Sequence, residues 1–108
     1  MQPDMMVLET IAKALAESCA VQESVLIDAR DQHGPSSPQA FVEATALAAM
    51  NGTITKVAYD LEKAGLIDNP VKYMIACGIR ENMAADAYAK YVELETKYKP
   101  FPDTEVQH

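Results

Sequence analysis

Apolar residues in the first third of the chain recur with the period of an α-helix. At about 100° per residue they fall on one stripe. The stripe contains Val7, Leu8, Ile11, Leu15, Cys19, Leu26 and Ala29. Asp4 can cap the first turn, and Gly34 followed by Pro35 can end the last one. The pattern therefore predicts one long helix over residues of about 4–32.

The middle of the chain predicts two short helices. A Ser-Pro pair starts the first, at about 38–50, in which Glu43 is the one charge and apolar residues surround the helix axis. Asn51 and Gly52 are expected to end it. A single apolar stripe and a terminal glycine then predict a second short helix at about 54–64.

The last predicted helix is long, at about 70–98, and begins after Asp68 or Asn69, either of which can cap it. Two long and two short helices predict an all-α fold, an antiparallel bundle in which the short pair packs beside the long helices. We assign residues 1–99 to this single domain and 100–108 to an extended C-terminal tail.

Three polar residues, Arg80, Glu81 and Asn82, lie in the middle of that last predicted helix. In a continuous helix they would span about 200° of the circumference, so at least one of them should be covered. A covered charge requires a partner, and for Arg80 the expected partners are Glu23, Asp28 or Glu43. The alternatives are a salt bridge that fixes helix register, a polar ligand pocket, or the point where burial ends. The candidate residues are Arg80, Glu81, Asn82, Gln22, Glu23 and Glu43.

Composition limits the partners that the chain can take. The 108 residues carry a formal net charge of −7. Such a chain lacks the clustered positive charge with which proteins bind nucleic acid or an anionic membrane, so we expect neither partner. The start of the chain does not have the pattern of a signal peptide, and no stretch is long and apolar enough to span a membrane. A cytoplasmic protein is therefore expected.

Nothing in the sequence has the pattern of an enzyme active site, and no catalytic residue is assigned. The two cysteines, Cys19 and Cys77, lie in apolar helical stretches and are predicted to be reduced, buried thiols. His33 precedes a Gly-Pro turn, so its pairing with Cys77 as a catalytic base has no support. No cofactor is predicted, and an enzymatic role is not favoured.

The apolar second helix and the apolar half of the fourth are more than one small chain can enclose. We therefore expect a homo-oligomer, a dimer before any larger assembly, with a structural, accessory or adaptor role and a further protein partner as an option. The candidate interface residues are Phe41, Val42, Leu47, Met50, Met74 and Ile75.

A bundle that binds a metal or a small ligand is the first alternative. The spacing of Glu81 and Tyr88 is similar to that in ferritin-like helices, although the Glu-x-x-His pairs of that family are missing. Iron or another divalent metal would be the cofactor, with ligands that the sequence does not identify.

A transcription regulator is the second alternative. The segment ALAAMNGTITKVAYDLEKAGLI, residues 46–67, resembles the helix-turn-helix of winged-helix repressors. The resemblance implies a turn near Asn51 and Gly52 and a helix over 53–64 that enters the major groove of DNA. A long predicted helix follows this segment, where that family has a wing of two strands.

Overall fold

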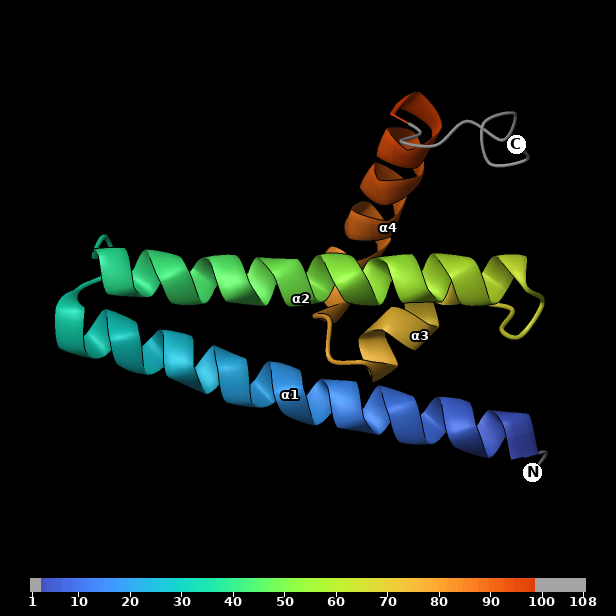
Figure 1. Cartoon of the computed structure of the whole chain (residues 1–108), viewed down its shortest axis with the longest axis horizontal. Coiled ribbons are helices and arrows are strands. Elements are labelled where there is room, and N and C mark those ends of the chain that lie inside the picture. Colours follow the sequence, from blue (N-terminus) through green and yellow to red (C-terminus); the bar gives the residue numbers. More distant parts are fainter. Residues whose placement is uncertain (1–2, 99–108) are drawn as a thin grey trace, which may run out of the picture.

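The computed structural model describes residues 3–98, which form four α-helices (Figure 1). The helices are α1 (Pro3–His33), α2 (Pro38–Lys63), α3 (Pro70–Ala76) and α4 (Glu81–Lys97). The long helices α1 and α2 lie antiparallel, and α3 and α4 are shorter (Figure 1). The predicted all-α class and the presence of two long and two shorter helices are thus confirmed, as is the long first helix. The predicted tail, 100–108, lies outside the described residues.

Helix α2 is one long helix, and the predicted pair of short helices at 38–50 and 54–64 is wrong. Its start is as predicted, because the Ser37 hydroxyl accepts the backbone N–H of Ala40 at 3.1 Å. The helix then continues through Asn51 and Gly52. A helical glycine costs about 1 kcal/mol relative to alanine, which the burial of apolar side chains beyond it offsets.

The predicted long helix at 70–98 is also wrong, since the chain breaks between α3 and α4. Gly78 adopts a φ of 104°, in the left-handed region that glycine tolerates. Its N–H donates to the Ile75 carbonyl, and the N–H of Ile79 donates to the Met74 carbonyl. This is the Schellman pattern that ends helices. A glycine followed by a large apolar residue is typical of this motif, as at Gly65 and Leu66, where the sequence also predicts a helix end.

The turn after α3 packs directly against α1. A Cβ atom added at Gly78 would lie 3.0 Å from the Ala16 Cα and 3.1 Å from the Cys19 Cβ. Close approach at this point joins all four helices in one hydrophobic core. Its buried members are Ala12, Cys19, Ile54, Ala58, Met74, Cys77, Ile79 and Ala84.

The shorter helices hold different positions on the α1–α2 pair. Helix α3 packs against both long helices, whereas α4 contacts α2 and α3 and extends away from the pair (Figure 1). The radius of gyration is 16.2 Å, compared with about 13 Å for a compact domain of this length. In residues 3–98, no helix combines the length and apolar character that crossing a membrane requires.

Candidate functional site

Arg80 lies just after the turn between α3 and α4, at the N-cap of α4. Its Nη2 donates a hydrogen bond to Glu23 Oε1 of α1 at 2.5 Å. Of the three predicted partners of Arg80, Glu23 is therefore confirmed. The two side chains are 65% and 37% exposed, so water screens the pair. An exposed pair of this kind contributes at most about 1 kcal/mol to stability.

Arg80, Glu81 and Asn82 are all exposed, so the prediction that at least one must be covered was wrong. The prediction assumed a continuous helix, but the chain changes direction at Gly78 and places the triplet at the start of a new one. Glu81 lies in the first turn of α4, where the helix dipole favours a carboxylate. Glu81 and Asn82 form no side-chain hydrogen bond or ion pair with any residue in the described range.

Gln22 and Glu43 form a second, separate polar contact. The Gln22 Nε2 donates to the backbone oxygen of Glu43 at 3.0 Å and to its Oε1 at 2.9 Å. Both side chains are half-buried, and the contact joins the last third of α1 to the start of α2. The six candidate polar residues thus supply two pairs on two parts of the molecule, and not one network.

A shallow hollow of about 250 Å³ lies beside the Arg80–Glu23 pair. Arg30 and Leu26 of α1, Asn51 of α2 and Met83 of α4 line it. The hollow is smaller than the roughly 300–1,000 Å³ of most ligand sites, and the Glu23 carboxylate already neutralises Arg80. Arg30 adds a second guanidinium to the hollow, so its small volume, and not its charge, is what disfavours a ligand site here.

The two cysteines are buried and carry free thiols, as predicted. Burial, with the neighbouring Cys19 as a smaller cause, raises the pKa of Cys77 to about 11. Burial also raises the pKa of Cys19, and the carboxylate of Glu23 adds to it. A thiol that stays protonated and covered near neutral pH is a poor nucleophile, so both residues act as core side chains.

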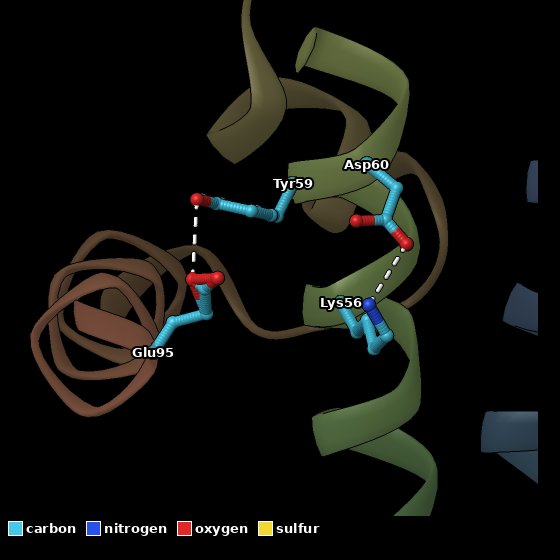
Figure 2. Close-up of polar contacts among 4 residues, drawn as sticks. All are labelled: Lys56, Tyr59, Asp60 and Glu95. Atoms are coloured by element: carbon cyan, nitrogen blue, oxygen red, sulfur yellow. Dashed lines mark hydrogen bonds and ion pairs between the residues drawn. The ribbon is translucent and has the colours of Figure 1, made fainter. Parts of the chain in front are cut away.

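Tyrosine side chains hold α4 against α2. The ring of Tyr59 on α2 lies 5.2 Å from that of Tyr91 on α4, and its hydroxyl donates to Glu95 Oε2 at 3.3 Å (Figure 2). The Tyr88 hydroxyl donates to Glu62 Oε1 at 2.9 Å. Burial, followed by this hydrogen bond, raises the pKa of Tyr88 to about 12. These contacts are structural anchors between two helices.

Two features of residues 3–98 bear on the metal and transcription-regulator alternatives. Within residues 3–98, His, Cys, Asp and Glu side chains do not gather in threes that could hold a metal ion. The helix-turn-helix resemblance lacks its turn, because α2 is continuous through Asn51 and Gly52. On the part of α2 that the resemblance would place in the major groove, the Lys56 ammonium is paired with the Asp60 carboxylate at 3.0 Å (Figure 2). Its charge is therefore already balanced within the helix.

The predicted interface residues divide into exposed and buried ones. Phe41 and Val42 at the start of α2 are 72% and 60% exposed, and Ile75 of α3 is also exposed. Leu47 and Met50 are half-buried. Met74 is fully buried in the core, so it belongs to the interior of the chain and leaves the candidate interface.

Further apolar surface lies on α1, in part at positions that the sequence pattern predicts to be buried. Val7 and Ile11 were placed on the buried stripe, yet both are exposed, as are Val21 and Val25. Each of these four residues lies one position before a residue of the covered stripe, and this offset is the signal that could have separated them from the core.

Comparisons with known proteins gave no match: no family model fits the sequence, and neither the curated proteins nor the solved structures contain a match. Function must therefore be inferred from the geometry of the chain itself.

Proposed function

We propose that the protein is a structural or adaptor protein that self-associates, as a dimer, through apolar surface on its helices. The observation that carries this proposal is the exposure of large apolar side chains on α1. Four of them lie on one side of that helix and are more than a third exposed, and they are Val7, Ile11, Val21 and Val25. Single exposed apolar residues are ordinary, but a row along one helix marks an interaction surface.

The shape of the chain supports the same proposal. A compact domain of this length has a radius of gyration of about 13 Å, and this chain has 16.2 Å. Six of the eleven buried apolar residues in the described range are alanine or cysteine, whereas fourteen large apolar side chains are exposed. Association would cover surface that folding of one chain leaves in water, and each square ångström of apolar surface covered contributes about 25 cal/mol.

Light scattering coupled to size-exclusion chromatography tests the proposal. At about 10 micromolar we expect a particle of twice the 11.8 kDa chain mass, with dissociation on dilution. Reductant should leave the mass unchanged, because both cysteines are buried and free. A particle of 11.8 kDa even at about 100 micromolar would contradict the proposal.

A further inference from the structure

Helix α1 carries two parallel stripes with the alternating steps of four and three residues that are typical of helices in bundles. The inner stripe faces the rest of the chain and consists of Leu8, Ala12, Leu15, Cys19, Gln22 and Leu26. The outer stripe lies one residue earlier at each step, and every member is exposed. It consists of Val7, Ile11, Ala14, Ser18, Val21 and Val25. One helix thus has two surfaces suited to helix packing, and the chain itself covers one of them.

Helix α2 continues the outer stripe across the α1–α2 pair. Val42, Ala46, Ala49 and Thr53 follow the same steps of four and three. Two hollows between the helices on this side are lined by residues of α1 and α2, among them Ser18, Val21 and Met50. We name this surface the open face. It consists of Val7, Ile11, Ala14, Ser18, Val21 and Val25 of α1 with Val42, Ala46, Ala49, Met50 and Thr53 of α2.

The two shorter helices lie on the other side of the α1–α2 pair. There the hollow between α1 and α2 is lined in part by Gly78, Arg80 and Met83, which belong to the α3–α4 turn and to α4. The ring of Tyr59 also reaches α4 from this side of α2 (Figure 2). The α1–α2 pair is therefore one layer with α3 and α4 on one face and, in residues 3–98, no helix on the other.

We propose that the open face binds the open face of a second copy of this chain. Two α1–α2 pairs then form a four-helix bundle around a twofold axis, with α3 and α4 of each copy on the outside. A self-complementary surface of this kind is the requirement for a symmetric dimer. The inference rests on the proposed self-association and adds to it the surface and the arrangement.

Charge favours a second copy over a partner of another kind. The residues assigned to the open face are uncharged, although the chain as a whole has a net charge of −7. Charges lie at its edges: Glu17 lines the same hollow as Ser18 and Val21, and the ion pair of Lys56 and Asp60 follows Thr53 on α2. Beside the face, the Glu43 carboxylate accepts a hydrogen bond from Gln22. Two acidic copies can therefore meet here without like charges at the centre, whereas a basic partner would require carboxylates that the face lacks.

The size of the face suits a dimer as well. Val7 to Val25 spans about 27 Å along α1, and two packed helices present a surface about 20 Å wide. Each copy would then contribute about 500 Å², giving a total of about 1,000 Å², the lower limit for a specific interface. Alanine and serine near the centre, at Ala14, Ser18, Ala46 and Ala49, allow the facing helices to approach closely.

A pair of matched variants on α1 tests this arrangement. Val21→Glu puts a carboxylate in the open face, and Ile27→Glu puts one on the opposite flank of the same helix. The two native side chains are 65% and 48% exposed in one chain, so neither change should unfold the monomer. Sedimentation equilibrium should show dimerisation at least about 100-fold weaker for Val21→Glu, because its carboxylate would be buried unpaired. Ile27→Glu should stay within about threefold of the wild type.

Further variants separate this inference from the proposed function. Ile11→Glu, on the same outer stripe, should weaken the dimer as Val21→Glu does, with helical content unchanged by circular dichroism. A dimer that survives both changes but is lost in Leu94→Glu, on α4, would overturn the open-face arrangement and leave self-association intact. Equal weakening by Val21→Glu and Ile27→Glu would also overturn it. A monomeric wild type would overturn both proposals.

Discussion

At the scale of single residues, Gly78 decides the course of the chain. Its positive φ ends α3, and its lack of a side chain lets the turn lie against the backbone of α1 at Ala16. Gly34, between α1 and α2, also has a positive φ, but a Cβ added there would meet nothing within 4 Å. Substitution of these two glycines by alanine therefore distinguishes two costs in stability. At Gly34 only the left-handed backbone is strained, whereas at Gly78 the added Cβ would also overlap α1.

Gly78→Ala should lower the free energy of unfolding by about 2–4 kcal/mol, because it combines left-handed strain with overlap against α1. Gly34→Ala should cost only about 1 kcal/mol, from the backbone strain alone. Urea denaturation at a fixed protein concentration measures both. Equal costs for the two variants would show that the turn does not pack against α1 in solution.

At the scale of helices, α2 continues through Asn51 and Gly52, two residues with poor helix propensity. Its two halves share one inner stripe, since Ala40, Leu47, Ile54 and Leu61 are spaced at regular intervals of seven residues. A turn at Asn51 and Gly52 would have broken this register. The helix continues because both halves pack on the same partners, which outweighs the poor helix propensity of two residues.

A substitution at Gly52 tests the continuity of α2. Gly52→Ala should raise the free energy of unfolding by about 0.5–1 kcal/mol, because the site is helical and a Cβ there meets no atom within 4 Å. Ala48→Gly, at another exposed position of α2, should lower it by a similar amount. Thermal denaturation gives both values. A loss of stability in Gly52→Ala would instead indicate a turn of the kind that the helix-turn-helix resemblance implies.

At the scale of the whole molecule, the described chain is one layer of two long helices with a smaller unit on one face. Helix α4 contacts α2 and α3 but not α1, and its anchors are the tyrosine contacts with Tyr59. Elements with fewer buried apolar contacts open more readily than the rest of a fold. Helix α4 is therefore the part of residues 3–98 that should detach first.

Hydrogen exchange should show this order of opening. Backbone amides of α4 should exchange faster than those at the centre of α1 and α2, and Tyr59→Ala should increase α4 exchange by about tenfold while leaving α1 unchanged. Tyr59→Phe removes only the hydroxyl that bonds Glu95 and should have a smaller effect. Uniform acceleration across all helices in Tyr59→Ala would mean that α4 opens only with the entire chain.

The sequence by itself determined the all-α class, the long first helix and the helix start at Ser37. It also narrowed the start of α3 to Asp68 or Asn69, and the partner of Arg80 to Glu23, Asp28 or Glu43. The class and the helix starts depend on caps and periodicity, which are local. The choice of Glu23 was made by the tertiary structure, because the contact joins residues 57 positions apart. Only the tertiary structure decided that the chain continues as a helix at Gly52 and turns at Gly78. It also decided that the inner stripe of α1, and not the outer one, is covered. The physical reason is that local preferences at these points amount to about 1 kcal/mol, less than the packing of distant side chains contributes.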